Sequence, residues 1–230
     1  NKRYRELEKQ HKLQGDERNL YVYQRFIKDY VRCIDGLDAQ IGRILRFLDE
    51  EGLAENTLLL YSSDQGFFTG EHGWAEKRWM YEESFKSPLL IRWPKVIEPG
   101  SVIDDLVQNI DLAPTFIRAA GMDVPKSLHG RPLQPLFSKA GPKEWREEIL
   151  YQYFDGGNQQ KPGPYNMPRH EGIRNLRYKL ISFYEYDAWE FYDLRNDPNE
   201  LKNLIDDSSL KATIEGMKKR LVVLKERFSP

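Results

Sequence analysis

The strongest restriction on the fold of this chain comes from a short apolar run that ends in polar residues. Residues 57–61 are apolar and β-prone, and residues 62–66, Ser-Ser-Asp-Gln-Gly, follow at once. The pattern predicts a short buried strand that runs into a loop. Because open α/β sheets bind ligands at the carboxyl ends of their strands, we expect Asp64 and Gln65 to lie where a parallel sheet builds its site.

Asp64 and Gln65 would offer two oxygen ligands to a metal ion. The carboxylate of Asp64 and the amide oxygen of Gln65 suit a hard cation such as Ca²⁺ or Mg²⁺, and neither is a nitrogen or sulfur donor. Two ligands do not complete a coordination shell. The two residues alone favour a simpler interpretation, in which Asp64 closes a turn at the strand end through local hydrogen bonds.

A glycine-punctuated loop follows, and it carries a lysine and a histidine. Gly66, Gly70 and Gly73 would let the loop fold back over the strand end, where Lys77 could offer a compact cation to an anionic group. The alternative for Lys77 is an ordinary solvated side chain in a charged stretch. His72 would shape the site or touch a substrate, and a loop-packing role is an equal alternative.

Several motifs in a fixed order resemble the sulfatase family of the alkaline-phosphatase superfamily. The loop from 61 to 84 is the first of them, and residues 30–48 resemble the helix that precedes the metal-binding strand in that family. The other matching segments are Ser-Pro-Leu-Leu-Ile-Arg-Trp-Pro at 87–94, Asn-Ile-Asp-Leu-Ala-Pro-Thr at 109–115, Leu-His-Gly-Arg-Pro-Leu at 128–133 and His-Glu-Gly-Ile-Arg at 170–174.

The resemblance implies a set of site residues. Asp64 and Gln65 are expected to bind Ca²⁺, with Mg²⁺ as the alternative, and Lys77 is expected to act in catalysis by contacting the sulfate. Two-zinc phosphatases of the superfamily typically place a histidine beside this aspartate, so Gln65 points to one hard cation and to sulfate ester chemistry. Substrate contacts are expected from Lys77, His72, His170 and Arg174, although His170 has about equal odds of having no substrate role.

The nucleophile of such an enzyme is absent from this sequence. Sulfatases of this type need a Cys or Ser in a C/S-x-P-S-R motif, which is converted to formylglycine, and no such motif occurs here. Cys33 is the only cysteine and lies in a helical pattern, where it is expected to be a buried, small apolar residue. The chain therefore resembles the C-terminal part of a larger enzyme, and formylglycine is expected in the missing N-terminal half.

The resemblance implies a sulfatase that hydrolyses sulfate esters, with a sulfated glycan such as glucosamine-6-sulfate as the expected substrate. This fragment alone is expected to have little or no turnover. One alternative is a phosphate or phosphonate ester hydrolase of the same superfamily. The other is a noncatalytic binding or structural fragment, which the absent nucleophile favours and the intact Asp64, Gln65 and Lys77 oppose.

The order of predicted elements indicates an α/β fold in two parts. Residues 1–142 are expected to form the C-terminal half of a large domain with a mixed sheet flanked by helices, and residues 143–230 a small antiparallel β subdomain with a C-terminal helix covering one face. Asp111 is expected to cap a helix, and Gly52 to end one. Helices are predicted at 2–12, 20–51 and 208–228, strands at 89–92, 149–154, 172–174, 178–184 and 189–193, and a long loop at 156–168.

Charge and hydropathy limit the partners of the chain. The 35 basic and 36 acidic residues are interspersed and leave a net charge of −1, which does not favour nucleic acid or an anionic membrane surface. No apolar run is long enough to span a bilayer, and residues 1–12 do not form a signal peptide. The family resemblance alone implies a periplasmic, extracellular or lysosomal location.

Overall fold

The computed structural model describes residues 6, 14–138, 141–142, 144–156 and 167–228. Two compact units are present: one contains residues 1–58 and 69–75, and the other contains residues 59–68 and 76–230. The helix predicted at 2–12 and most of the loop predicted at 156–168 lie outside the described residues. The predicted domain boundary after residue 142 stays a prediction.

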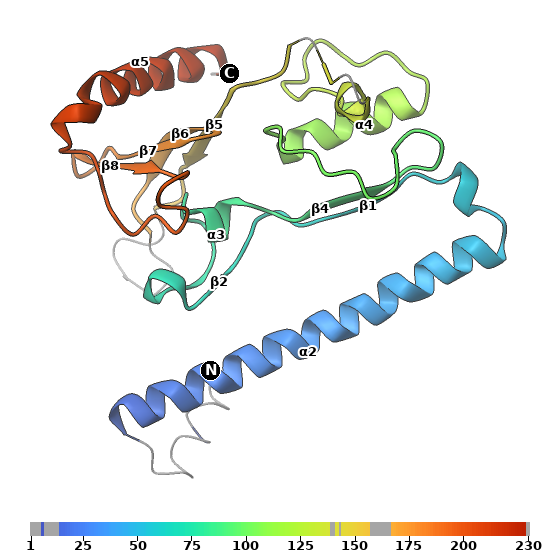
Figure 1. The fold of residues 1–230 in the computed structure, drawn as a ribbon, viewed down its shortest axis with the longest axis horizontal. Coiled ribbons are helices and arrows are strands. Elements are labelled where there is room, and N and C mark those ends of the chain that lie inside the picture. Colours follow the sequence, from blue (N-terminus) through green and yellow to red (C-terminus); the bar gives the residue numbers. More distant parts are fainter. Residues whose placement is uncertain (1–5, 7–13, 139–140, 143, 157–166, 229–230) are drawn as a thin grey trace. The chain divides into compact units, whose positions relative to one another are not determined.

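The first unit is built on one long helix, α2 (Gly15–Glu50), which extends the predicted helix toward the N-terminus (Figure 1). Its end confirms the predicted role of Gly52, which has a φ of 66°. The amide of Gly52 donates to Asp49 O at 3.2 Å, and the amide of Leu53 donates to Leu48 O at 2.8 Å. These two bonds form a Schellman motif, which glycine favours because its φ is positive.

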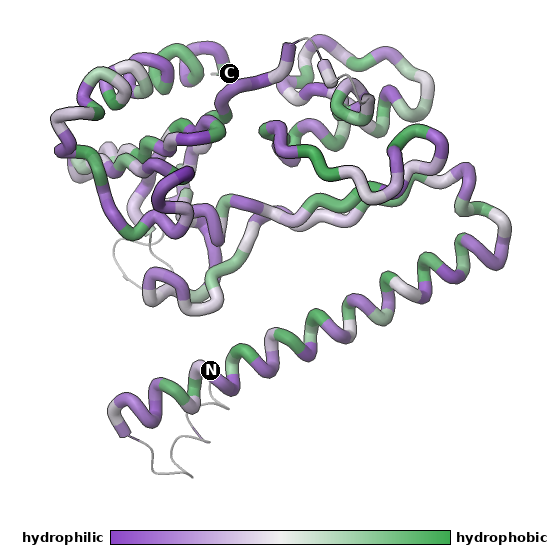
Figure 2. The backbone as a smooth tube through the Cα atoms, viewed as in Figure 1, coloured by the Kyte–Doolittle hydropathy of each residue, from purple (hydrophilic) through white to green (hydrophobic). Residues whose placement is uncertain are grey.

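The apolar face of α2 belongs to the first unit. Apolar residues recur along the helix at helical spacing, as the repeated green segments in Figure 2 show, and within the described residues no side chain of α2 is buried. That this face covers the sheet stays a prediction, because the strands belong to the second unit. The large exposed apolar side chains of α2 are Leu20, Tyr23, Val31, Ile34, Leu37, Ile44 and Phe47.

The predicted strand before the polar cluster is present as β1 (Leu59–Ser62), and it pairs with β4 (Leu89–Arg92). The pairing is antiparallel, with Leu60 opposite Ile91. The expectation of a parallel sheet at this strand end is therefore wrong for the described residues. The chain returns beside β1 within a few tens of residues through a loop, and such a return gives an antiparallel pair.

Short elements connect these strands. Residues 76–88 lead through α3 into β4, and residues 93–147 contain α4 (Leu112–Ala119). The remaining short elements are η1 (Ala54–Asn56), β2 (Phe68–Thr69), η2 (Glu71–Gly73), β3 (Ala75–Glu76), α3 (Glu82–Phe85), η3 (Asn109–Asp111), η4 (Gln134–Phe137) and η5 (Ser208–Leu210).

An antiparallel sheet of four strands confirms the predicted C-terminal architecture. The strands follow one another in the order β5-β6-β7-β8, and the next regular helix is α5 (Lys211–Phe228). In the register, Leu150 lies opposite Ile173, and Leu180 lies opposite both Ile173 and Phe191. The strand bounds are β5 (Glu148–Tyr153), β6 (His170–Asn175), β7 (Tyr178–Phe183) and β8 (Ala188–Asp193).

Both faces of this sheet are covered, whereas the sequence predicted one. Leu180 of β7 faces a cluster with Met217 and Leu221 of α5, and its neighbour Ile181 faces the opposite cluster with Met80. β7 is accordingly buried from Lys179 to Phe183, on both of its faces. Residues 79–85, which come from far earlier in the sequence, therefore form the second covering layer of the sheet.

Asp111 stands at the predicted helix start, but its side chain does not cap α4. Its carboxylate is fully buried and accepts hydrogen bonds from the amides of Gln108 at 2.7 Å and Arg131 at 2.8 Å. Arg146 also donates to both of its oxygens. Asp111 is thus the N-cap residue of α4 by position, as predicted, but its side chain caps η3, where it forms a capping box with Gln108. Arg146 supplies the cationic partner that a buried carboxylate needs.

Candidate active site

Gly66 sets the course of the chain after β1. Its amide donates to the carbonyl oxygen of Ser84 in α3 at 2.8 Å. A Cβ atom at Gly66 would lie 2.1 Å from Glu83 O and 2.8 Å from Lys86 O, so no other residue fits here without moving the backbone. The close approach brings Asp64 and Gln65 next to the segment that carries Lys77.

Asp64 and Lys77 form an ion pair between Asp64 Oδ2 and Lys77 Nζ. The hydrogen bond from Lys77 is the main reason that the pKa of Asp64 lies below its usual value, and the Gln65 amide, which donates to Asp64 Oδ1 at 2.9 Å, acts in the same direction. The carboxylate stays accessible, with 70% of its side chain exposed. Asp64 is therefore ionised, oriented and open to a ligand, as a metal-binding carboxylate must be.

The backbone on both sides of Lys77 is in the left-handed region. Glu76 has a φ of 85° and Arg78 a φ of 100°, although neither is a glycine. Such conformations cost about 1–3 kcal/mol each and persist only where surrounding contacts hold them. Two contacts hold Arg78: its amide donates to Ser84 Oγ at 2.7 Å, and its carbonyl oxygen accepts from Tyr151 Oη at 2.6 Å.

Gln65 lies in contact with the same tyrosine. Burial raises the pKa of Tyr151 to about 12, and a hydrogen bond with the Gln65 side chain opposes that rise. Both residues line a groove of about 780 Å³ that also includes Asp64 and Arg174. Three of the site residues predicted from the sequence therefore open into one groove.

Asn109 is a site residue whose role the sequence did not reveal. Its side-chain amide donates to the carbonyl oxygen of Asp64 at 2.9 Å and to that of Ser63 at 3.3 Å. The contact ties the strand-end loop to η3. The only sequence signal was its place in the Asn-Ile-Asp-Leu-Ala-Pro-Thr motif.

Arg174 reaches the groove but is already paired. Its Nη2 lies 3.0 Å from Glu82 Oε2, and Lys179 Nζ lies 2.8 Å from the other oxygen of Glu82 and 2.7 Å from Glu200 Oε1. Burial acts to raise the pKa of Glu82, but Lys179 and Arg174 outweigh it and lower this pKa to about 2. Glu200 differs, because burial dominates and raises its pKa to about 7. This charged cluster attaches α3 to the sheet.

His170 lies inside the core rather than at a surface. The residue is fully buried, and its Nδ1 lies 2.9 Å from Pro168 O. Burial lowers the pKa of its imidazole. The buried position favours the alternative in which His170 has no substrate role. A substrate contact by His170 stays a prediction. Aromatic rings surround it with centroids 5.3–5.6 Å away, from Trp79, Tyr151, Tyr153 and Phe183.

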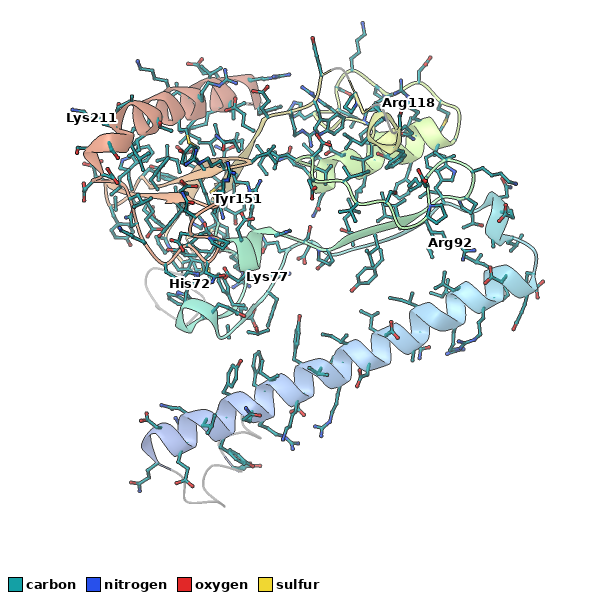
Figure 3. All side chains as sticks on the ribbon, viewed as in Figure 1. His72, Lys77, Arg92, Arg118, Tyr151 and Lys211 are labelled. Atoms are coloured by element: carbon teal, nitrogen blue, oxygen red, sulfur yellow. The ribbon has the colours of Figure 1, made fainter. Side chains whose placement is uncertain are left out.

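His72 belongs to the first unit, whereas Asp64, Gln65 and Lys77 belong to the second. It lies in η2 with a φ of 55°. Its predicted contact with the substrate stays a prediction. Figure 3 labels His72 and Lys77 on the segments from which they project.

The donor set fits the hard cation predicted from the sequence, although it is incomplete. Asp64 supplies an ionised carboxylate and Gln65 an amide oxygen, both of which suit Ca²⁺ or Mg²⁺. Among the described residues, no group of three or more His, Cys, Asp or Glu side chains could hold a metal by itself. Asp64 and Gln65 alone do not complete a coordination shell for either cation.

Known protein families match both halves of the chain. Residues 1–122 match the family described as sulfatase. Residues 70–227 match the family described as N-sulphoglucosamine sulphohydrolase, C-terminal. The helices of the described residues include none that is long and apolar enough to cross a membrane.

Several curated proteins are similar to this chain. The N-acetylglucosamine-6-O-sulfatase of Bacteroides thetaiotaomicron is 42% identical over 195 residues, which are 84% of this chain and 34% of that protein. The arylsulfatase of Clostridium perfringens is 30% identical over 196 residues, which are 84% of this chain and 38% of that protein. The chain thus spans little more than a third of the length of these relatives.

Solved structures share the fold. The structure of BT4656 in complex with its substrate D-glucosamine-2-N,6-O-disulfate has a TM-score of 0.88 and 37% identity, over 95% of this chain and 44% of that chain. The phosphonate monoester hydrolase from Silicibacter pomeroyi has a TM-score of 0.73 and 26% identity, over 83% of this chain and 38% of that chain. The chain therefore belongs to the sulfatase family of the alkaline-phosphatase superfamily, and it corresponds to the C-terminal region of that family.

Proposed function

We propose that this chain carries part of the metal and sulfate site of a sulfatase that hydrolyses sulfate esters of a glycan. The observation that supports the proposal most directly is the ion pair of Asp64 with Lys77 beside the amide oxygen of Gln65. The three groups provide two hard oxygen ligands and a cation within one short segment. A sulfate group bound there would meet positive charge from Lys77 and from the metal.

Each residue has a role that follows from its chemistry. Asp64 and Gln65 would hold Ca²⁺, which when bound supplies positive charge at the sulfate oxygens. Formylglycine, expected elsewhere in the enzyme, would supply the nucleophilic hydroxyl for sulfate ester hydrolysis. Lys77 would bind a sulfate oxygen and stabilise the negative charge that develops in the transition state. Its ion pair with Asp64 keeps the ammonium group beside the metal ligands.

The proposed substrate class is a sulfated glucosamine. Two similar proteins support it: the 42% identical relative is named N-acetylglucosamine-6-O-sulfatase, and BT4656 was solved with a sulfated glucosamine. The groove of about 780 Å³ beside Asp64 and Gln65 contains both apolar and charged side chains, as a sugar with a sulfate group requires. Sulfate would bind next to Asp64 and Lys77, and the sugar would extend along the groove.

The phosphonate monoester hydrolase with a TM-score of 0.73 supports a second candidate, hydrolysis of phosphate or phosphonate esters. The proposed metal ligands favour one of the two candidate reactions over the other. Gln65 adds an oxygen ligand rather than the imidazole that zinc prefers, which favours one hard cation. Turnover of matched sulfate and phosphonate esters, with metal content per chain, distinguishes the two chemistries.

The test uses the full-length protein and measures release of inorganic sulfate from glucosamine-6-sulfate. Lys77→Ala should lower kcat by about 10²–10³-fold, because one charge-stabilising group is lost. Lys126→Ala is the matched control, since Lys126 is an exposed lysine on a distant loop. Asp64→Asn should weaken Ca²⁺ binding in calorimetric titration, with Asp123→Asn as its control because Asp123 is exposed. Wild-type turnover by Lys77→Ala would remove Lys77 from the site, and unchanged Ca²⁺ affinity would remove Asp64.

A further inference from the structure

Ser84 and Tyr151 each lie against the two segments that make up the proposed site. Ser84 is fully buried in α3, and Tyr151 lies in β5. One part of the site is the strand-end loop with Asp64 and Gln65, and the other is the segment that carries Lys77. Figure 3 labels Lys77 on its segment and Tyr151 on β5.

Ser84 uses two different atoms for its two contacts. Its carbonyl oxygen accepts from the amide of Gly66 at 2.8 Å, and its hydroxyl oxygen accepts from the amide of Arg78 at 2.7 Å. Gly66 directly follows Gln65, and Arg78 directly follows Lys77. One buried residue therefore holds the metal-ligand loop through its backbone carbonyl and the lysine segment through its side-chain hydroxyl.

Tyr151 makes the corresponding contacts from the sheet. Its hydroxyl group donates to the carbonyl oxygen of Arg78 at 2.6 Å, and Tyr151 lines the same groove as Gln65. The ring packs edge-on against Phe85 with centroids 5.4 Å apart, so the hydroxyl position is itself well defined. Ser84 and Tyr151 thus hold the amide and the carbonyl of the same residue, Arg78.

This double attachment explains why the strained backbone at Arg78 persists. Arg78 has a φ of 100° although it is not a glycine. Without the two hydrogen bonds, the segment would relax toward an ordinary backbone conformation, and the Lys77 side chain would leave its place beside Asp64. A misplacement of about 1 Å at a reacting centre can cost roughly 10²-fold in rate.

The geometry points to Ser84 and Tyr151 as positioning residues that set the distance and orientation of Lys77 relative to the Asp64–Gln65 pair. The inference rests on the proposed function, because it gives Lys77 its role at the sulfate. Tyr151 also lines the groove proposed for the sugar, but its hydroxyl donates to the backbone of Arg78, and Ser84 is fully buried. Both act by holding the backbone of Arg78.

The experiment is a double-mutant cycle in the full-length enzyme, with inorganic sulfate release as the readout. Tyr151→Phe removes only the hydroxyl, and Ser84→Ala removes only the acceptor for the Arg78 amide. Each should lower kcat by about 10–100-fold, with KM changed by less than about threefold. Tyr153→Phe is the matched control: Tyr153 lies two residues further along β5 and packs against the same cluster, and its hydroxyl forms no hydrogen bond with the residues that the structure describes.

The same substitutions in a Lys77→Ala background decide whether the effect passes through Lys77. If the residues position Lys77, Tyr151→Phe and Ser84→Ala should change kcat of that variant by less than about twofold. A fold defect or a loss of active enzyme would instead lower kcat equally in both backgrounds, and this result would overturn the inference. Unchanged kcat for both single variants would also overturn it.

The proposed function and this inference fail in different ways. Wild-type kcat for Lys77→Ala would refute the role of Lys77 itself, and the inference would fall with it. A large loss for Lys77→Ala together with wild-type kcat for Tyr151→Phe and Ser84→Ala would leave the proposed function standing and refute only the positioning role. Thermal unfolding of each variant checks that the fold is kept, and Tyr151→Phe carries the test alone if Ser84→Ala does not fold.

Discussion

Replacing Glu200 with Gln tests the buried charge cluster that attaches α3 to the sheet. Glu200 is 2% exposed and lies 2.7 Å from Lys179 Nζ, and its second oxygen accepts from the amide of Glu82 at 2.6 Å. Glutamine has nearly the same shape and keeps an oxygen for that amide. The substitution therefore removes the titration of Glu200 while leaving the packing almost unchanged.

The magnitude follows from the raised pKa of Glu200. Burial raises this pKa from the usual 4.5 to about 7, so the folded protein keeps a proton that the unfolded chain releases in this interval. The contribution of Glu200 to stability is therefore fully present below about pH 4.5 and is lost as the pH rises through about 7. A shift of this size corresponds to about 3 kcal/mol. The pKa of Glu82 is shifted in the opposite direction, to about 2. Glu82 therefore adds nothing to the pH dependence of the free energy of unfolding above about pH 5.

Urea unfolding of the full-length protein at about pH 5 and about pH 8 measures the effect. Relative to the wild type, Glu200→Gln should gain as much as about 3 kcal/mol in the free energy of unfolding between the two pH values. Glu215→Gln is the matched control, because Glu215 is 53% exposed and pairs only with Lys218. A difference between Glu200→Gln and wild type that stays constant with pH would refute the reasoning, since Glu200 would then be ionised throughout.

Two further substitutions test the packing and the second buried ion pair. Gly172→Ala should destabilise the sheet by about 1–3 kcal/mol, because its Cβ would lie 2.3 Å from Leu180 O and 2.4 Å from Met80 Sδ. The control Gly216→Ala has open space and should stabilise α5 slightly, so equal urea midpoints for the two variants would contradict this account. Arg146→Met should cost about 3–5 kcal/mol by leaving the fully buried Asp111 carboxylate unpaired. Arg118→Met, at an exposed position in α4, should cost almost nothing, and a similar thermal shift for both arginine variants would rule out the buried pair as the cause.

Local patterns in the sequence predicted the elements well. The strand at 89–92 matches β4 in full, and the helix predicted at 208–228 contains α5. Gly52 ends α2 as predicted, because the need for a positive φ at a helix end is a local property. The Asp64, Gln65 and Lys77 segment also stood out locally, and the structure brings Asp64 and Lys77 into contact.

Long-range partners could not be predicted in the same way. The direction of β1 depends on β4, and the second cover of the sheet depends on residues 79–85, which pack on strands far along the chain. The sequence around Asp111 indicates a helix cap, but it does not reveal that Arg146 donates a hydrogen bond to the Asp111 carboxylate. No sequence pattern around Ser84 predicts that its hydroxyl accepts from the Arg78 amide, because the tertiary fold brings the two groups together.

The place of Tyr151 in the chain has a consequence for synthesis. Tyr151 follows Arg78 by 73 residues, so it leaves the ribosome roughly 4–15 s after Arg78 at ordinary rates of translation. Until β5 emerges, the segment that carries Lys77 has neither its sheet nor the tyrosine that holds its backbone. The Lys77 segment therefore cannot take its final form before β5 has been made, although the metal-ligand pair is made early.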